Sequence, residues 1–263
     1  MSDNYQQRFG GIARLYGESE AEQLRELHVC VIGLGGVGSW AVEALARTGI
    51  EKITLIDFDT VSASNSNRQL PAMQSTLGMK KHAVMAARVA DINPDCQCHV
   101  IDDFITEKNM ADYLDRGYDY VIDAIDSISF KAAIIYYCRR NKIPIITTGG
   151  AGGLIDPTQV SYRDLTRTCN DALAAKVRAC LRQRHGYTRN PQRYFGVECV
   201  YSTEQPRYPA GEGKVSFAKP GIHGVSMDCN FAYGSSSVVT SVFGFVAVSR
   251  VIEKSLRRLA KQK

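Results

Sequence analysis

A cluster of glycines, followed further along the chain by an acid, has the residue types and spacing of a nucleotide-binding site. Residues 29–32 form a short apolar run, as in a buried parallel strand, and this run ends at closely spaced glycines: Gly33, Gly35, Gly36 and Gly38. Glycines let backbone N–H groups approach a phosphate, and a helix starting at Ser39 would add the partial positive charge of its N-terminus. A second apolar run, 53–56, ends at Asp57, about 20 residues beyond the last glycine, where a carboxylate can bind a ribose hydroxyl. This pattern alone is as typical of a dinucleotide site as of other nucleotide sites.

Basic and amide side chains that follow Asp57 favour a triphosphate. The block 64–69 is Ser-Asn-Ser-Asn-Arg-Gln, and Lys81 follows in an expected helix. Arg68 can bind phosphate oxygens with two N–H groups at once, whereas Lys81 acts as a point charge. In a redox dinucleotide, the helix N-terminus already offsets the negative charge of the phosphates, so two further cations are not needed. A triphosphate that gains negative charge during a reaction can be stabilised by both.

The elements that must position these residues alternate between strand and helix. We expect strands at 29–32, 53–56, 99–101, 120–122, 144–148 and 159–163, and helices at 18–27, 39–47, 80–92, 108–115, 131–141 and 172–184. This alternation predicts an α/β fold with a doubly wound, mainly parallel, Rossmann-like sheet. Right-handed crossovers bring the carboxyl ends of the strands, and with them the site, to one edge of the sheet.

Acids and glycines at two later strand ends extend this edge. Asp123 and Asp126 follow the strand 120–122, where they either cap the next helix or bind a metal ion. The glycine-rich stretch 149–153 follows the strand 144–148. It either lets the backbone approach a ligand closely or forms a mobile turn.

The length and composition fit one large domain. The 263 residues are 44% hydrophobic, which is enough to bury a sizeable core, so we expect a single domain over 1–263. Its nucleotide-binding half would be 1–150, and 151–263 would face the substrate and include a C-terminal helix. The eight cysteines are scattered without any CxxC pair, and the polar N-terminus lacks the apolar region of a signal peptide. These features predict a reduced, cytoplasmic protein.

Positive charge is concentrated in 151–263. This half holds 17 Lys and Arg against 8 Asp and Glu, whereas 1–150 holds 15 against 19. The basic surface is either an ordinary solvated face or a nucleic-acid-binding face, since neutralising phosphates releases counterions. Tyr187, Tyr194 and Phe195 follow closely on the basic residues, and their rings could stack on an unpaired RNA base.

Three further stretches lie outside the strand–helix alternation. Residues 185–225 are rich in Gly and Pro and predict one long loop. Residues 235–252 are the most apolar, but they contain five Ser, one Thr, one Gly and Arg250. We therefore expect a buried helix, packed at a subunit interface, instead of a membrane span. Residues 254–263 would form a basic tail.

Together these motifs resemble the ubiquitin-activating-enzyme-like superfamily, which includes the adenylyltransferases that activate sulfur-carrier proteins for molybdopterin and thiamine. The matched pattern is the glycine-rich loop, Asp57, the SNxNRQ block, Lys81 and the strand end DAIDS. Within the superfamily, QRFGGIARLYG, CRRNKIP, TTGGAGG, IDPTQ and FGFVAVS resemble the tRNA threonylcarbamoyladenosine dehydratase family over nearly the whole chain. Because no CxxC pair exists, the four-cysteine zinc site of the sulfur-carrier enzymes has no ligands here.

The resemblance implies ATP and Mg²⁺ as cofactors and gives residues their roles. The catalytic residues would be Asp126, Lys81, Arg68 and Arg8, and the nucleotide would be bound by Gly33, Gly35, Gly36, Gly38, Asp57, Asn65, Asn67, Arg68, Gln69, Lys81 and Ser127. Asp126 would hold Mg²⁺ beside the triphosphate. In a homodimer, either Arg8 or Arg14 of the N-terminal arm 5–17 would reach into the partner subunit's ATP site.

The implied reaction is ATP-dependent dehydration, with ring closure, of N6-threonylcarbamoyladenosine beside the tRNA anticodon. Adenylation of the threonyl carboxylate would release pyrophosphate, and ring closure would release AMP. Two alternatives stay open: adenylation of the C-terminus of a small sulfur-carrier protein, and a non-catalytic, nucleotide-dependent docking protein for a sulfur-transfer partner. Cys229 is either a packed residue or a thioester-forming nucleophile.

Overall fold

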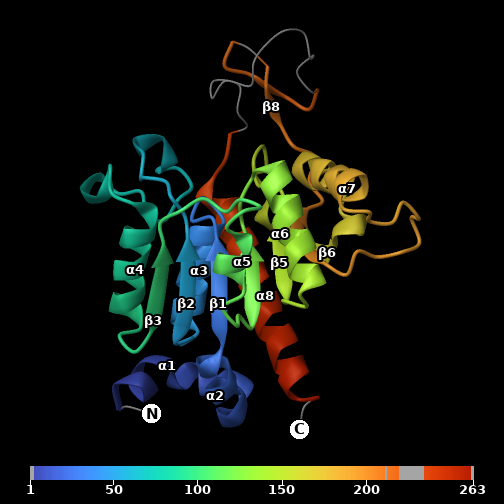
Figure 1. Ribbon diagram of the computed structural model, residues 1–263. Coiled ribbons are helices and arrows are strands. Elements are labelled where there is room, and N and C mark those ends of the chain that lie inside the picture. Colours follow the sequence, from blue (N-terminus) through green and yellow to red (C-terminus); the bar gives the residue numbers. More distant parts are fainter. Residues whose placement is uncertain (1–2, 211, 219–233, 262–263) are drawn as a thin grey trace.

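The computed structural model describes residues 3–210, 212–218 and 234–261, and its centre is a seven-stranded sheet (Figure 1). The strands of this sheet are β1 (His28–Ile32), β2 (Lys52–Ile56), β3 (Gln97–Ile101), β4 (Tyr120–Asp123), β5 (Ile145–Thr148), β6 (Val160–Asp164) and β7 (Glu198–Ser202). Their order is β3-β2-β1-β4-β5-β7-β6, and only the pair of β6 and β7 is antiparallel. The doubly wound, mainly parallel sheet predicted from the sequence is confirmed.

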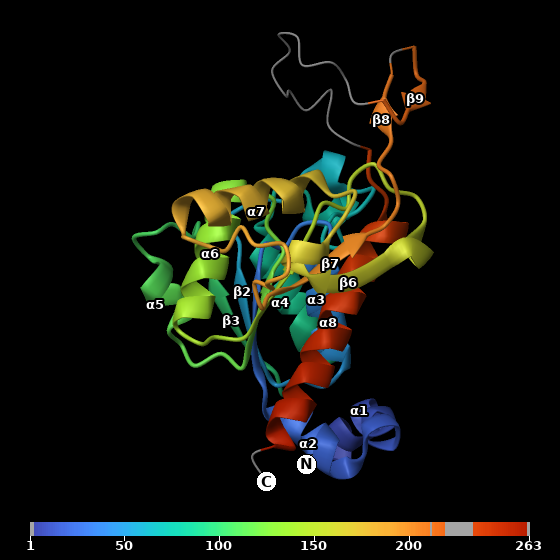
Figure 2. The ribbon, with the colours of Figure 1, turned by 90° about the vertical axis from the view of Figure 1, so that its right-hand side faces the viewer.

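Helices cover both faces of the sheet. The helices are α1 (Asp3–Tyr16), α2 (Glu18–Glu26), α3 (Gly38–Arg47), α4 (Lys81–Ile92), α5 (Met110–Leu114), α6 (Ile128–Arg140), α7 (Ala172–Arg184) and α8 (Ser237–Leu259). Side chains of α3, α4 and α8 pack on one face, and those of α5, α6 and α7 pack on the other. The helices α1 and α2 lie beyond the amino ends of the strands, at the bottom of Figure 1. A short hairpin of β8 (Tyr208–Pro209) and β9 (Val215–Ser216) projects at the opposite end (Figure 2).

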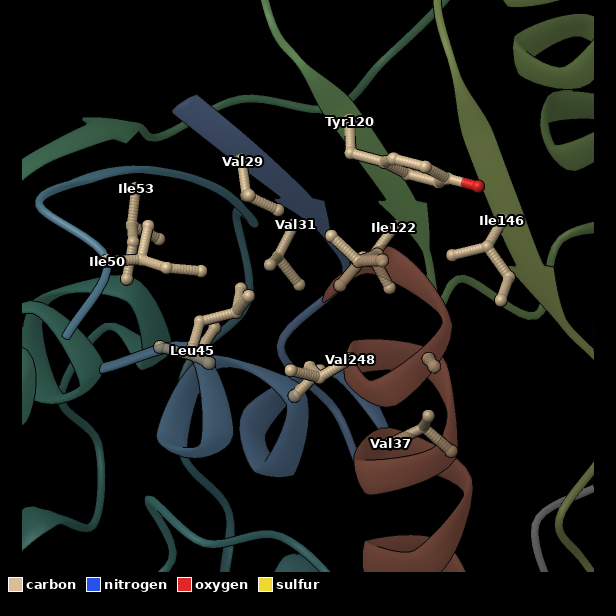
Figure 3. Close-up of a cluster of buried hydrophobic side chains, with 14 of the residues drawn as sticks. Val29, Val31, Val37, Leu45, Ile50, Ile53, Tyr120, Ile122, Ile146 and Val248 are labelled. Atoms are coloured by element: carbon tan, nitrogen blue, oxygen red, sulfur yellow. The ribbon is translucent and has the colours of Figure 1, made fainter. Parts of the chain in front are cut away.

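The central strand β1 is apolar at every position after the first, because helices cover both of its faces. Val29 and Val31 belong to the cluster under α3 and α8, whereas Cys30 and Ile32 belong to the cluster under α6. Successive side chains of a strand point to opposite faces, so a strand covered on both faces needs apolar residues at odd and even positions. Figure 3 shows Val31 in the first cluster, between the sheet and α8.

The apolar stretch near the C-terminus forms α8, which lies along α3. Val239, Phe243 and Val251 of α8 are fully buried, so the predicted buried helix is confirmed. Gly244 permits the close contact, because a Cβ there would lie 2.7 Å from the carbonyl oxygen of Val37 and 2.8 Å from the backbone nitrogen of Ala41. Among the described helices, none has both the length and the apolar character needed to span a bilayer. The subunit interface expected for this helix stays a prediction.

Two stretches differ from the sequence-based predictions, and the N-terminal arm, for which no secondary structure was predicted, is helical. Residues 185–225 are not one long loop, because β7 lies within them and pairs with β5 and β6. The strand is only five residues long, and the segments on either side are rich in Gly and Pro, so its strand pattern is not evident from the sequence. The N-terminal arm is the helix α1, whose Tyr5 and Phe9 pack under Gly49. The basic tail is mostly helical, since α8 continues to Leu259.

Candidate active site

The glycine-rich turn lies between β1 and α3, at the carboxyl edge of the sheet. The strands β2 and β4 lie on opposite sides of β1, so the winding of the chain changes direction here, which is where ligands bind in open α/β sheets. Gly33 has a φ of +86°, and a Cβ on it would lie 3.1 Å from the carbonyl group of Ala124. A Cβ on Gly38 would lie 1.7 Å from the carbonyl oxygen of Gly33. Glycine is therefore required at both positions.

Asp57 holds the first part of this turn. Its carboxylate is buried, and Oδ2 accepts a hydrogen bond from the backbone N–H of Leu34 at 2.6 Å. Oδ1 accepts a second hydrogen bond from the backbone N–H of Asp59 at 2.8 Å. A carboxylate oxygen can accept more than one hydrogen bond, so Asp57 keeps capacity for a ribose hydroxyl.

Asn65 and Asn67 hold their own segment in place. Asn65 is buried, and its Oδ1 accepts a hydrogen bond from the backbone N–H of Ser62 at 3.1 Å. Asn67 Nδ2 donates to the carbonyl oxygen of Ser235 at 2.7 Å, which ties the segment to the chain just before α8. Both amides have a local structural role, and their contact with a nucleotide stays a prediction.

Arg68 and Gln69 border the glycine-rich turn. Arg68 Cγ would lie 3.3 Å from a Cβ on Gly36, and Gln69 Nε2 would lie 3.9 Å from a Cβ on Gly35. The guanidinium group of Arg68 donates to the carbonyl oxygen of Ser64 at 2.9 Å. Gln69 is buried, and its Oε1 has no hydrogen-bond partner among the residues that the structure describes. Both side chains thus lie beside the glycine-rich turn, and their contact with phosphate oxygens stays a prediction.

Lys81 begins α4 and contributes the second cation. Its side chain is buried, and Nζ lies 2.8 Å from Oδ2 of Asp59, whose side chain is 49% exposed. Asp59 follows β2, so the pair lies at the same carboxyl edge as the glycine-rich turn. A bound triphosphate would compete with Asp59 for the ammonium group.

Asp123 and Asp126 have opposite surroundings at the end of β4. Asp123 is fully buried, with Oδ1 3.0 Å from Nζ of Lys131 and Oδ2 accepting from Oγ1 of Thr147 at 2.8 Å. Burial raises the pKa of the Asp123 carboxyl, and the charge of Lys131 opposes the rise. Asp126 is exposed and has no ion pair or hydrogen bond to any described residue. It can supply the single carboxylate that Mg²⁺ takes alongside phosphate oxygens and water.

Asp126 is therefore the carboxylate that fits the metal role expected of it. No cluster of three or more His, Cys, Asp or Glu side chains suited to a metal ion occurs within 3–210, 212–218 and 234–261. The donor set of one carboxylate suits a cation that arrives with a nucleotide. Ser127, whose side chain makes no capping hydrogen bond, precedes α6 at the same edge.

A buried base beneath this edge, Lys131, was not among the residues predicted from the sequence. Lys131 is 1% exposed, and besides its ion pair it donates to the carbonyl oxygens of Asp123 at 3.2 Å and Ile125 at 2.8 Å. These bonds hold the chain that leads to Asp126. The sequence does contain a signal: Lys131 directly precedes the apolar run 132–135 in an expected helix. A lysine on the buried side of a helix needs an acid or other polar partner, which here is Asp123.

The glycines after β5 make room for an acid of α7. Asp171 caps α7 through the backbone N–H of Ala174 and also accepts from the backbone N–H of Gly150 at 3.0 Å. A Cβ on Gly149 would lie 1.7 Å from Oδ2 of Asp171. Burial raises the pKa of Asp171, and the backbone hydrogen bonds oppose the rise. The beginning of α7 is thus joined to the edge that carries the nucleotide site.

Arg8 does not join the other candidate residues within one chain. Its Nη1 lies 3.3 Å from the carbonyl oxygens of Asp91 and Ile92, at the end of α4. This end of α4 is at the amino edge of the sheet, away from the glycine-rich turn (Figure 1). Arg14 is exposed on the same helix, α1. Action of either arginine in a partner subunit stays a prediction. Cys229 lies outside the described residues.

The fold and the site define a nucleotide-binding domain of one known class. The ThiF family matches residues 10–260, and the chain belongs to this family. It is 52% identical to the tRNA threonylcarbamoyladenosine dehydratase of Escherichia coli, over 100% of this chain and 98% of that protein. A solved structure of the E. coli enzyme in complex with ATP aligns with 100% of this chain and over 99% of its own chain, with 49% identity and a TM-score of 0.89. A molybdopterin-synthase adenylyltransferase of Haemophilus influenzae is more distant, at 31% identity over 60% of this chain and 68% of that protein.

Proposed function

We propose that this protein catalyses the ATP-dependent dehydration, with ring closure, of N6-threonylcarbamoyladenosine in tRNA. The observation that carries the proposal is the full-length identity of 52% to a relative named for this reaction. The site supports the ATP-dependent step, because the glycine-rich turn, Arg68, Gln69, Lys81 and Asp126 all lie at the carboxyl edge of the sheet. The basic helix α7 also begins at this edge, where Asp171 bonds to Gly150.

ATP is needed because a carboxylate does not expel hydroxide readily. The threonyl carboxylate attacks the α-phosphorus of ATP, and pyrophosphate leaves. The carbamoyl group of the same side chain then attacks the activated carbonyl carbon, the ring closes, and AMP leaves. The nucleophile and the carbonyl belong to one side chain, so ring closure is favoured by proximity.

The residues at the edge have separate roles in this reaction. Asp57 accepts a hydrogen bond from the ribose, while Arg68 and Lys81 bind phosphate oxygens and offset the charge that grows on the leaving pyrophosphate. Asp126 would hold Mg²⁺, which would further neutralise phosphate charge. Lys131 keeps the segment before Asp126 in place through its hydrogen bond to Ile125.

We further propose that the protein works as a cytoplasmic homodimer in which Arg8 completes the partner's site. Two arguments support this arrangement. First, Arg8 lies at the amino edge, so it cannot reach the nucleotide site of its own chain. Second, arginines that enter a neighbouring active site stabilise charge on a transferring phosphoryl group. The described cysteines are free thiols, as is usual in a reducing compartment.

The test is mass spectrometry of nucleosides from tRNA that contains N6-threonylcarbamoyladenosine, incubated with the protein and Mg-ATP. We expect the modified nucleoside to lose the mass of one water molecule and AMP to form in equal amount. Asp126→Asn should lower the rate by about a hundredfold or more with little change in stability, since its side chain is exposed. Asp112→Asn, also exposed and on α5, is the matched control.

Two outcomes would redirect the proposal. If no dehydrated nucleoside forms, while pyrophosphate exchange appears only with a small protein ending in Gly-Gly, the chain is a carrier-protein adenylyltransferase. If Asp126→Asn forms product at the wild-type rate, the edge does not hold the reacting nucleotide.

A further inference from the structure

The surface of α7 and of the loop that follows it carries an unusual excess of positive charge. Residues 165–197 contain seven Lys and Arg, and their single acid is Asp171. Asp171 is buried and engaged with backbone N–H groups, so it does not neutralise the surface. Of these cations, Arg167, Lys176, Arg184, Arg189 and Arg193 are exposed.

None of these bases forms an ion pair within the described part of the chain, in contrast to the bases of α8. Arg250, Lys254, Arg257 and Arg258 of α8 each pair with an acid. Like charges that are left unpaired on one helix and its loop repel one another and weaken the fold slightly. A surface with this property fits a polyanionic partner that supplies the missing negative charge.

One aromatic ring on this surface is open to solvent. Tyr194 is 63% exposed, and the guanidinium carbon of Arg167 lies 4.9 Å from the centre of its ring. The other two rings predicted to stack on bases are not free. Phe195 is buried, and Tyr187 packs against it at 4.7 Å between ring centres. The exposed ring of Tyr194, with the guanidinium group of Arg167 over it, can stack on an unpaired base.

The basic surface begins at the nucleotide site and leads away from it. The hydrogen bond between Gly150 and Asp171 fixes the first turn of α7 at the carboxyl edge. The helix packs on α6, which begins just after Asp126, and extends across that end of the molecule in Figure 2. Its 13 residues span roughly 20 Å, a length that several consecutive phosphates of an RNA strand can follow.

We propose that Arg167, α7 and residues 185–197 form the surface that binds the RNA substrate. The exposed bases contact backbone phosphates, and Tyr194 with Arg167 stacks on an unpaired base of the loop. The inference rests on the proposed function for the identity of the RNA, an anticodon stem-loop. It adds the place where the RNA lies, which the nucleotide site does not determine. Unpaired basic residues that outnumber acids along this segment, beside an exposed ring, favour RNA, whose phosphates and unpaired bases match both features.

Binding of a labelled anticodon stem-loop that carries N6-threonylcarbamoyladenosine tests the inference, measured by fluorescence anisotropy at several salt concentrations. The double variant Lys176→Gln with Arg184→Gln should bind about tenfold or more weakly at low salt. Its plot of log K against log salt should be shallower by about 0.7 for each lost phosphate contact. Tyr194→Ala should weaken binding roughly tenfold with the salt slope unchanged, because stacking involves no counterion release.

A matched control removes the same charges elsewhere. Lys52→Gln with Arg140→Gln changes one Lys and one Arg that are exposed at the start of β2 and the end of α6, both at the amino edge. This control should bind RNA as the wild type does. Binding of a fluorescent ATP analogue, which should be the same in all variants, shows that each variant is folded.

The outcomes separate this inference from the proposed function. If the wild type forms dehydrated nucleoside but the α7 double variant and Tyr194→Ala bind RNA as the control does, the function stands and the surface is wrong. If the wild type binds ATP but neither binds the RNA nor changes it, both proposals are overturned. Loss of RNA binding in the control as well would show that the charge of the whole protein, and not α7, attracts the RNA.

Discussion

At the end of β4, two carboxyl groups of the same residue type meet different surroundings. Asp123 is surrounded by Lys131, Thr147 and the core, whereas Asp126 is in solvent. A buried carboxylate is stable only when paired, so Asp123 and Lys131 depend on each other. An exposed carboxylate is free to bind a cation. The burial of each side chain therefore suits Asp123 to a structural role and Asp126 to the metal-binding role proposed for it.

Removal of Lys131 should be strongly destabilising. Lys131→Met leaves the carboxyl of Asp123 buried without its ion pair, and we expect a loss of about 3–5 kcal/mol in the free energy of unfolding. Urea denaturation at neutral pH measures it. The double variant Asp123→Asn with Lys131→Met should lose less than the single one, and Lys108→Met, an exposed lysine, should lose almost nothing. A loss below about 1 kcal/mol for the single variant would mean that the pair is solvated.

At the scale of elements, α8 joins parts that are distant in sequence. It packs along α3 through Gly244, and its Arg250 forms ion-paired hydrogen bonds of 3.0 and 2.9 Å with both carboxylate oxygens of Glu198 in β7. Lys254 lies 3.1 Å from the same carboxylate. The helix thereby covers one face of the sheet and also orients the strand that precedes the hairpin.

Gly244→Ala should destabilise the protein even though alanine favours a helix. The added methyl group would meet the backbone of α3, at Val37 and Ala41, which cannot move aside as a flexible side chain does. We expect a net loss of about 1–3 kcal/mol, seen as a lower midpoint of thermal unfolding. Ser249→Ala, on the exposed side of α8, should leave the midpoint almost unchanged or raise it slightly. An increase for Gly244→Ala would show that α8 and α3 are farther apart than described.

The ion pairs of Glu198 should make stability depend on pH. Burial by itself would raise the pKa of Glu198, but hydrogen bonds from Arg250 and Lys254 outweigh it and hold the pKa below its usual value. A carboxyl with a lowered pKa in the folded state contributes stability above its unfolded pKa and loses that contribution as the pH falls through the folded pKa. Urea unfolding from pH 7 downward should show this loss. Glu198→Gln should be less stable at pH 7 and should lose less on acidification; a parallel decline in both proteins would contradict the assignment.

At the scale of the whole molecule, the groups proposed to take part in the reaction lie at two opposite ends. The carboxyl edge carries the nucleotide site, α7 and the projecting hairpin, whereas α1 with Arg8 lies beyond the amino edge (Figure 1). In this arrangement, Arg8 therefore cannot reach the candidate nucleotide site of its own chain. A symmetric dimer can place the edge of one chain against the α1 helix of another.

Mixing two inactive variants tests this arrangement. If Arg8 acts in trans, Arg8→Ala and Asp126→Ala are each inactive, but subunit exchange creates dimers with one intact site. Random exchange of equal amounts should restore roughly a quarter of wild-type product formation per subunit. Arg14→Ala mixed with Asp126→Ala tells the two arginines apart. A mixture that stays inactive after exchange is demonstrated, or an Arg8→Ala variant that is fully active, would exclude Arg8 from this role.

Local patterns in the amino-acid sequence were enough to predict most of the elements and the nucleotide edge. The apolar run, the glycines and the acid at Asp57 are close in sequence, and the constraints that select them operate within a few residues. The alternation of strands and helices then leaves few topologies, because crossovers are right-handed. The helix 172–184 was predicted with the bounds that the structure has.

The tertiary structure decided what depends on contacts between distant segments. The strand β7 pairs with β5 across about fifty residues, and Glu198–Ser202, although it contains Val200 and Tyr201, is too short a run to predict a buried strand by itself. The burial of Asp123 depends on Lys131 and Thr147 of two other elements, and the exposure of Tyr194 beside a buried Phe195 depends on how the loop packs against α7. Burial and charge pairing are properties of the assembled chain, because residue type and spacing do not specify which surfaces will meet.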